Sequence, residues 1–272
     1  MESKKLILLI GLFILGQLAK AQHQEKFSKE VFVQGVDSLL FRQLLPKDFN
    51  PKKSYPLVLF LHGAGERGAD NTKQLTHGAA VFTADSIQEQ FPAIVLFPQC
   101  PKADYWSQVT ADRSNYPVQL DFKYQEGPTQ SMKMVLQLLD TYLQQEYVDK
   151  DQVYVMGLSM GGMGTFELIY RKPEIFAAAI PICGAGDPKT VNTYAQTTPI
   201  WAFHGAQDNV VAPTQSLAMV NALLEAGAHP KFTLYDFANH NSWDPAFVEP
   251  DLLPWLFSKT KNQNTEKKTN EE

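Results

Sequence analysis

One serine stands between two glycines in the stretch VYVMGLSMGGMG, directly after a run of apolar residues that predicts a buried strand. Gly157 and Gly161 would remove the Cβ atoms that a sharp turn from strand to helix brings into collision. Ser159 would then take a strained backbone conformation with positive φ, which proteins tolerate mainly at functional sites. The turn would also place the backbone N–H of Met160 at a helix N-terminus, where negative charge is favoured. The stretch predicts a nucleophile elbow, with an ordinary strand–helix turn as the alternative.

A serine nucleophile needs a base, and the base needs a carboxylate that orients it. With an elbow of this kind, the acid and then the base follow the serine along the chain. His240 comes just after the last predicted strand, in FANHNSWD, and is the predicted base, whereas His204 is expected to be structural and His229 a solvated loop residue. Asp208 lies in HGAQDNVV, after the preceding strand, and is the predicted acid, with Asp187 as the alternative. The acid would hold the imidazole tautomer and stabilise the imidazolium.

Acyl transfer also needs donors for the oxyanion that forms on the substrate. The backbone N–H of Met160 is one candidate. The loop HGAGERG, residues 62–68, follows another apolar strand, and its glycines let the backbone approach a substrate closely. We assign the second donor to Ala64, with Gly65 as the alternative.

The elements that must position these residues alternate along the chain. Apolar runs separated by helical patterns predict a mostly parallel sheet of about eight strands, covered by helices on both faces. An antiparallel hairpin is expected to open the domain. The predicted strands are residues 30–33, 39–44, 55–63, 93–100, 153–159, 177–184, 199–205 and 231–237, and the predicted helices begin near residues 132, 160 and 217.

Four motifs in this order, HGAGERG, GLSMGG, HGAQDNVV and HNSW, resemble the α/β-hydrolase superfamily. More narrowly, they are similar to secreted esterases and predicted peptidases related to polyhydroxybutyrate depolymerases and feruloyl esterases. The likeness covers about residues 32–258. It implies an α/β-hydrolase fold and a triad of Ser159, Asp208 and His240. It also implies that no metal and no organic cofactor take part.

The segments around the predicted site bear on the substrate. The loop at residues 184–199 is too short for a lid domain, and the longest irregular segment is 101–127, which is rich in aromatic residues. We expect Tyr105, Trp106 and Trp243 to contact the substrate, although aromatic residues in such a loop can also serve to pin it to the body. Together these features favour a serine carboxylesterase acting on acetyl or feruloyl esters of plant polysaccharides. The alternatives are a serine peptidase acting on short peptides and a non-catalytic carbohydrate-binding protein.

The two ends of the 272-residue chain differ from its middle in composition. Lys4 and Lys5, an apolar run at 6–18 and the small-residue pattern AKA predict a signal peptide at 1–21, with a membrane anchor as the alternative. The catalytic domain is then 22–258, and 259–272 is a polar tail expected to be disordered. We therefore expect a secreted or periplasmic protein that is not inserted in a membrane after cleavage. The net charge of −5 argues against nucleic acid as a partner.

The chain has two cysteines, Cys100 and Cys183, and export permits a disulfide. Each lies at the end of a predicted strand. The strand order 4-3-5-6 implied by the resemblance separates the two ends by three inter-strand steps, or about 14 Å. A disulfide needs Cα atoms within about 7 Å. We therefore predict two free and largely buried thiols.

Overall fold

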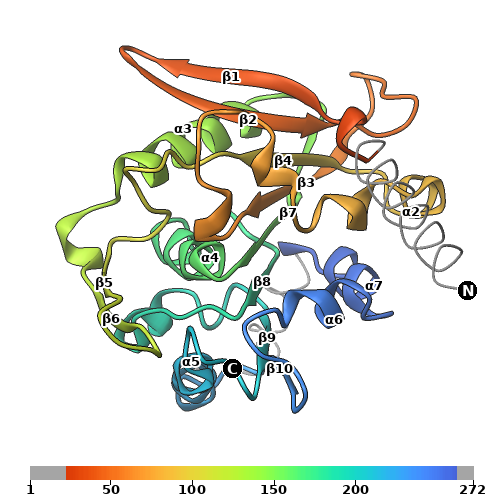
Figure 1. The fold of residues 1–272 in the computed structure, drawn as a ribbon. Coiled ribbons are helices and arrows are strands. Elements are labelled where there is room, and N and C mark those ends of the chain that lie inside the picture. Colours follow the sequence, from red (N-terminus) through yellow and green to blue (C-terminus); the bar gives the residue numbers. More distant parts are fainter. Residues whose placement is uncertain (1–22, 262–272) are drawn as a thin grey trace, which may run out of the picture.

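The computed structural model describes residues 23–261 (Figure 1). The predicted signal peptide lies outside the described residues, and so does most of the predicted tail. Lys259 is an exception, because its backbone carbonyl accepts a hydrogen bond of 2.8 Å from the hydroxyl of Tyr154. No helix among residues 23–261 is long and apolar enough to cross a membrane.

The centre of the molecule is an eight-stranded sheet in the order β1-β2-β4-β3-β7-β8-β9-β10. The opening strands β1 and β2 form the expected antiparallel hairpin, and β2 pairs antiparallel with β4. All other neighbours in the sheet are parallel. The predicted α/β-hydrolase fold is confirmed. The strands of this sheet are β1 (Ser28–Gln34), β2 (Asp37–Leu44), β3 (Tyr55–Leu61), β4 (Ile94–Pro98), β7 (Val148–Leu158), β8 (Ala178–Ile182), β9 (Trp201–Gly205) and β10 (Lys231–Tyr235).

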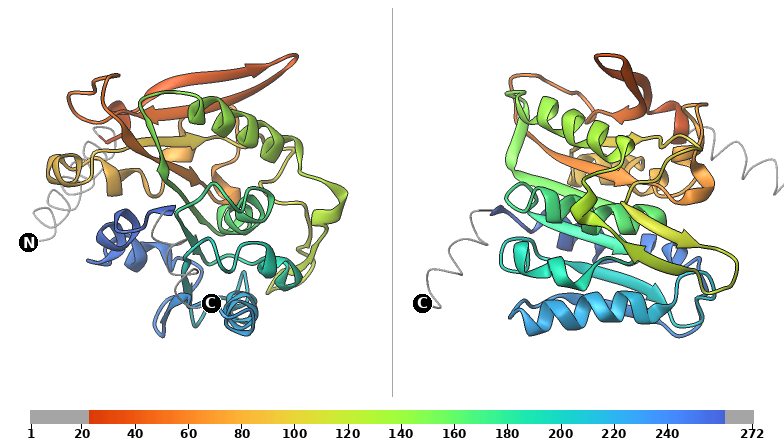
Figure 2. Two further views of the ribbon diagram at one scale, coloured as in Figure 1. Left: turned by 180° about the vertical axis from the view of Figure 1, so that it is seen from behind. Right: turned by 90° about the vertical axis from the view of Figure 1, so that its left-hand side faces the viewer.

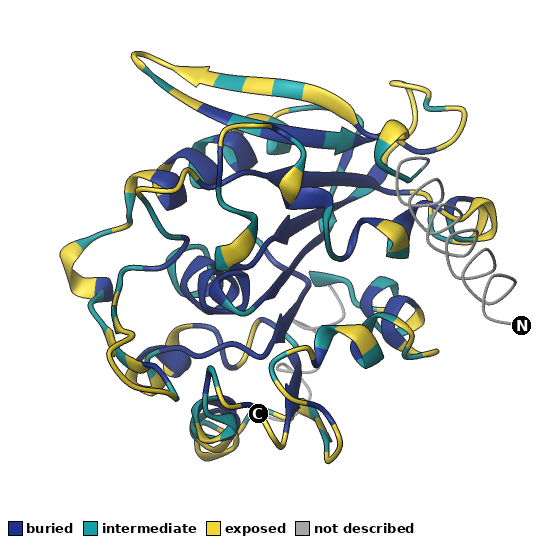
Figure 3. Ribbon diagram, in the orientation of Figure 1, coloured by how far each residue is buried: buried dark blue, intermediate teal, exposed yellow. Residues whose placement is uncertain are grey.

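Helices cover both faces of the sheet (Figure 2). On one face lie α3 (Gln130–Leu143), α4 (Met160–Arg171) and α5 (Pro213–Glu225); on the other lie α2 (Asp85–Gln90), α6 (Trp243–Phe247) and α7 (Leu252–Phe257). Strand β3 is apolar without interruption because both of its faces are covered. Leu57 and Leu59 pack into the core under the first set of helices, whereas Val58 and Phe60 pack into the core on the other face. The central strands are accordingly buried, whereas the edge strand β1 is largely exposed (Figure 3).

The segment 101–127 is not irregular throughout, so that expectation was wrong. It contains a separate two-stranded antiparallel sheet, β5 (Val109–Asp112) with β6 (Gln119–Phe122), followed by a short 3-10 helix, η4 (Tyr124–Glu126). Each strand has four residues that alternate between partial burial and exposure, and neither forms an apolar run. Such short strands leave little signal in the sequence.

The connection from β8 to β9 holds a 3-10 helix, η5 (Pro188–Thr193), and no lid domain, which confirms that expectation. The strand order also separates the two cysteines as predicted. Cys100 follows β4 and Cys183 follows β8, with β3 and β7 between them. Both thiols are free and buried.

Candidate active site

Ser159 occupies the turn between β7 and α4 with φ 54° and ψ −116°, a strained conformation for a residue with a side chain. The flanking glycines make this turn possible. A Cβ at Gly157 would collide with the backbone of Gly161, and a Cβ at Gly161 would collide with the carbonyl oxygen of Leu61. The predicted elbow is therefore present, and its backbone holds the serine at the carboxyl end of the central strand.

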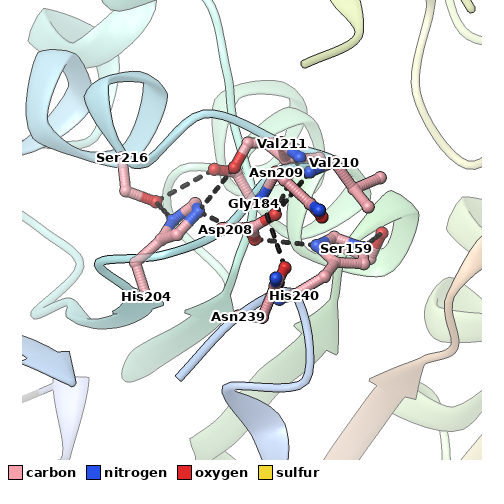
Figure 4. Close-up of polar contacts among 10 residues, drawn as sticks. All are labelled: Ser159, Gly184, His204, Asp208, Asn209, Val210, Val211, Ser216, Asn239 and His240. Atoms are coloured by element: carbon pink, nitrogen blue, oxygen red, sulfur yellow. Dashed lines mark hydrogen bonds and ion pairs between the residues drawn. The ribbon is translucent and has the colours of Figure 1, made fainter. Parts of the chain in front are cut away.

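The three predicted triad residues form a chain in which His240 lies between Ser159 and Asp208 (Figure 4). Ser159 Oγ is 2.9 Å from His240 Nε2, and His240 Nδ1 is 2.7 Å from Asp208 Oδ2. Because Nδ1 keeps its proton and donates it in a hydrogen bond to the carboxylate, Nε2 is left to accept the serine proton. Asp187, the alternative acid, instead caps η5 by accepting a hydrogen bond from the backbone N–H of Lys189.

Two loops from neighbouring strands bring the acid and the base together. Asp208 follows β9 and His240 follows β10. Gly205 lets these loops touch, since a Cβ there would collide with the carbonyl oxygens of Ala238 and Asn239. The side-chain carbonyl of Asn239 then joins the loops, because it accepts from the backbone N–H groups of Asn209 at 3.2 Å and His240 at 2.7 Å.

Asp208 is buried but extensively hydrogen-bonded. Its Oδ1 accepts from the backbone N–H groups of Val210 at 2.9 Å and Val211 at 3.0 Å. Burial alone would raise the pKa of this carboxyl, but the hydrogen bonds from His204, His240 and Val210 lower it well below its usual range. Asp208 is therefore an anion at neutral pH and can stabilise an imidazolium at His240.

His204 and His229, the other two histidines that follow Ser159 in the sequence, differ in their surroundings. His204 is fully buried beside Asp208, with its Nε2 3.2 Å from Asp208 Oδ2, and it packs in the body as expected for a structural residue. His229 is exposed in the loop before β10. Neither competes with His240 for contact with Ser159.

The predicted oxyanion donors begin two helices. Met160 is the first residue of α4, and Ala64 is the first residue of the 3-10 helix η1 (Ala64–Glu66). Backbone N–H groups at helix starts have no partner within the helix, so both are available to a substrate oxygen. Ala64 and the alternative donor Gly65 both line the pocket beside Ser159.

Side chains behind the loop at residues 62–68 fix its position. Gln99 donates to the carbonyl of Glu66 at 3.2 Å and to Asp70 at 3.0 Å, and it accepts from the backbone N–H of Asn71 at 2.7 Å. His62 Nδ1 lies 2.6 Å from the carbonyl of Gly63, and Nε2 accepts from Cys100 N at 3.0 Å. Burial lowers the pKa of His62 to about 4, so the ring is neutral and serves as a fixed support.

A pocket with a volume of about 250 Å³ opens at Ser159 and His240. Tyr105 and Trp243, which the sequence predicts to contact the substrate, line this pocket. Trp106 is not among the lining residues. It is fully buried, donates from its indole N–H to the carbonyl of His62 at 3.0 Å and packs against Gly164. Its predicted role in substrate contact is therefore corrected to support of the loop at residues 62–68.

Sequence reasoning missed most of the pocket wall. An apolar part of the wall comes from α4, from the β5–β6 hairpin and from the loop after Asp208, and charged or titratable groups add to the lining. The missed residues are Leu158, Met163, Val118, Leu120, Val210, Val211, Glu66, His77 and Arg113. Val210 and Val211 follow the acid directly in HGAQDNVV, so they carried the clearest signal.

The β5–β6 hairpin is held beside the pocket by a buried carboxylate. Glu167 on α4 accepts from the hydroxyl of Ser107 at 2.9 Å and from the backbone N–H of Gln108 at 2.6 Å. Its other oxygen accepts from Arg171 Nε at 2.7 Å. This arrangement ties the start of the hairpin to the helix that begins at the elbow.

Comparisons with known proteins agree with this fold. Residues 50–249 match the family described as phospholipase/carboxylesterase. A solved thermostable esterase is 36% identical, with a TM-score of 0.78 over 88% of this chain and 64% of that chain. A protein of Oryza sativa subsp. japonica whose name describes a carboxylesterase is 24% identical over 200 residues, which are 70% of this chain and 83% of that protein.

A further relative is longer than this chain. A protein of Schizosaccharomyces pombe whose name describes a dipeptidyl aminopeptidase is 23% identical over 250 residues, which are 80% of this chain but 27% of that protein. This chain thus spans about a quarter of that relative and 64% of the thermostable esterase. On the match across residues 50–249 and the sheet order, the chain belongs to the phospholipase/carboxylesterase family of α/β hydrolases.

Proposed function

We propose that this protein is a serine carboxylesterase that works through an acyl-enzyme. The observation that carries the proposal is the hydrogen-bond chain from Ser159 through His240 to Asp208, with distances of 2.9 Å and 2.7 Å, at a strained elbow that lines a pocket. A protein that only binds carbohydrate would not need a strained serine aligned with a base and an acid. The geometry therefore favours catalysis over binding alone.

The reaction follows from the placement of these groups. His240 Nε2 takes the proton of Ser159 as Oγ attacks the ester carbonyl, and the imidazolium that forms is stabilised by Asp208. The backbone N–H groups of Ala64 and Met160 donate to the oxyanion of the tetrahedral intermediate. The imidazolium then protonates the leaving alcohol, and water attacks the acyl-enzyme by the same route, which frees the acid and restores Ser159.

We propose an acyl group carried on a polysaccharide as the substrate, either acetyl or feruloyl. Two features support this choice. Tyr105 and Trp243 offer aromatic faces at the pocket, and the connection from β8 to β9 adds no lid domain that would exclude a bulky alcohol. The segment at residues 1–21 supports export, because its composition is that of a signal peptide, and an extracellular or periplasmic enzyme would meet such polymers.

A peptidase acting on short peptides is the competing function, and the name of the S. pombe relative favours it. Parallel assays with p-nitrophenyl acetate and a peptide p-nitroanilide separate the two. We expect rapid release from the ester and little from the anilide, and the reverse ratio would refute the esterase. Acetylated and feruloylated oligosaccharides then identify the acyl group. Absence of activity on both oligosaccharides, with activity on p-nitrophenyl acetate intact, would refute the polysaccharide substrate while leaving the esterase in place.

A further inference from the structure

The catalytic carboxylate touches a second histidine besides the base. His204, on β9, has no exposed surface, and its Nε2 lies 3.2 Å from Asp208 Oδ2 and 3.0 Å from the carbonyl oxygen of Val211 (Figure 4). Both neighbours are acceptors, since one is an ionised carboxylate and the other a peptide carbonyl. A bare nitrogen there would face two oxygens in a buried site, which is unfavourable. Nε2 of His204 therefore carries a proton.

The other ring nitrogen fixes the orientation of the imidazole. Nδ1 of His204 is 2.7 Å from the hydroxyl oxygen of Ser216, and this hydroxyl is 2.9 Å from the carbonyl oxygen of Gly184. Ser216 and Gly184 come from α5 and from the loop after β8, so the ring is held between separate elements. The Ser216 hydroxyl has one proton, and when it donates this proton to Nδ1, the neutral ring carries its own proton on Nε2.

We propose that His204 is a positioning residue that shares Asp208 Oδ2 with the catalytic base and limits how strongly the carboxylate holds the protonated form of His240. This inference rests on the esterase function proposed above. Oδ2 accepts a hydrogen bond from His240 Nδ1 at 2.7 Å and lies 3.2 Å from His204 Nε2, while Oδ1 accepts from two backbone N–H groups. The second donor withdraws part of the negative charge that would otherwise act on His240 alone.

The effect on pH dependence has a definite sign. Loss of the His204 donor leaves Asp208 Oδ2 to His240 alone, so the protonated base is stabilised and the acid limb of kcat/KM moves to higher pH. Among the described residues, the titratable and charged groups around this pair are Cys183, beside Asp208 and His240, and Glu66, His77, Tyr105 and Arg113 along the pocket. The substitutions below leave all of them unchanged.

Two variants separate positioning from packing. His204→Phe keeps a planar ring but removes both ring nitrogens, and we expect its acid limb to rise by about half to one pH unit. His204→Gln keeps an N–H donor near Asp208 and should retain the wild-type limb. If His204 only fills space, both variants would lower kcat without moving the limb. An unmoved limb in folded His204→Phe, or a shift to lower pH, would overturn the proposal.

A measurement on the active protein without substrate tests the same claim independently. In protein labelled with ¹⁵N-histidine, nuclear magnetic resonance should show a protonated Nε2 for His204 from about pH 5 to about pH 8. The signal is assigned by its loss in His204→Gln and its retention in His229→Gln, which changes an exposed histidine. An unprotonated Nε2 in this range would overturn the inference even if His204→Phe does not fold. If the wild type shows this signal but hydrolyses no ester, the esterase function fails while the assigned proton stands.

Discussion

Asp208 carries out its role from a buried position, where a carboxylate is stable only if it is fully hydrogen-bonded. Two backbone N–H groups and His240 donate hydrogen bonds to it, and His204 Nε2 lies 3.2 Å from its Oδ2. They lower the pKa of Asp208 well below its usual range, which outweighs the opposite effect of burial. The negative charge that orients His240 is therefore present at every pH at which the enzyme is expected to work.

Replacement of this carboxylate should strongly reduce the rate of ester hydrolysis. In Asp208→Asn the side chain can offer its amide N–H to His240 Nδ1, which favours the wrong tautomer, so kcat should fall by roughly three to four orders of magnitude. Residual activity would come from the oxyanion donors and substrate binding. Steady-state hydrolysis of p-nitrophenyl acetate measures the change, with Asp187→Asn as the control, because Asp187 caps η5 away from the triad. A damaging Asp187→Asn together with an active Asp208→Asn would show that the acid is misassigned.

At the scale of elements, the elbow and the β5–β6 hairpin differ in how they are built. The elbow depends on backbone atoms of two strands and one helix that touch without intervening side chains. The hairpin is a small separate sheet held by Glu167 and its hydrogen bonds to Ser107 and Gln108. The elbow is part of the core. The β5–β6 hairpin is a wall of the pocket, and its sequence can vary without altering the main sheet.

Gly161→Ala should therefore destabilise the whole fold. Its methyl group would meet the carbonyl oxygens of Leu61 and His62, and neither backbone segment can move without disturbing β3. We expect a loss of about 2–4 kcal/mol in the free energy of unfolding, seen as a lower Tm. Gly65→Ala is the matched control, since a Cβ there meets nothing within 4 Å and should cost less than about 0.5 kcal/mol. Equal Tm values for the two variants would contradict the close-contact account of the elbow.

The sequence specifies the triad better than it specifies the pocket, and neighbouring residues show why. Ser159, Asp208 and His240 each follow an apolar strand and obey a fixed order, so strand ends and chain order suffice to find them. Tyr105 and Trp106 are adjacent in a segment without apolar periodicity. Nothing in their local sequence tells which ring faces the pocket; the structure places Tyr105 there and Trp106 inside, against Gly164.

The second donor to Asp208 escaped prediction for a related reason. The strand that ends in HG indicates that His204 is buried, and it was therefore expected to be structural. Its contact with Asp208 depends on the turn that brings residues 204 and 208 together, and on Val211 and Ser216 holding the ring. In a helix, residues four apart are known to be neighbours. Around a tight loop no such rule holds, so the sequence does not predict this contact.

At the scale of the whole molecule, the order of strands decides which residues meet. Parallel strands in the order β4-β3-β7-β8-β9-β10 bring their carboxyl ends to one edge, where the elbow, the oxyanion loop, the acid loop and the base loop converge. The same order keeps the two cysteines apart. Helices on both faces bury the strands, so the site rests on a rigid layer.

The free thiols give a chemical test of that order. Thiol titration of the denatured, unreduced protein should find two equivalents per chain, because Cys100 and Cys183 lie at strands separated by β3 and β7. The native protein should react slowly, since burial raises the pKa of Cys100 to about 12 and raises that of Cys183 still further. A finding of no free thiol before reduction and two after it would contradict the strand order.

Stability at acid pH tests how the oxyanion loop is anchored. Burial alone would raise the pKa of Asp70, but hydrogen bonds from Lys73 N, Gln99 and Thr72 N lower it to about 2. This carboxylate thus stabilises the fold above about pH 4, and the contribution is lost as the pH falls through about 2. Asp70→Asn should lower the Tm at neutral pH, and its difference from wild type should shrink between about pH 4 and about pH 2.

Asp236→Asn, which removes one exposed carboxylate after β10, is the control for loss of a surface charge. Thermal unfolding of the three proteins across this range measures the differences. A gap between Asp70→Asn and wild type that stays constant down to about pH 2 would show that the Asp70 carboxylate does not anchor the loop through its charge.

The central claim is that Ser159 is the nucleophile, and covalent labelling tests it most directly. Reaction with a fluorophosphonate, followed by intact mass and peptide mapping, should add one phosphonyl group per chain, located on Ser159, and abolish hydrolysis of p-nitrophenyl acetate. Ser159→Ala, folded as judged by its Tm, should take up no label and lose the activity. A label on another residue, or a folded Ser159→Ala protein that hydrolyses the ester within about tenfold of the wild-type rate, would contradict the account.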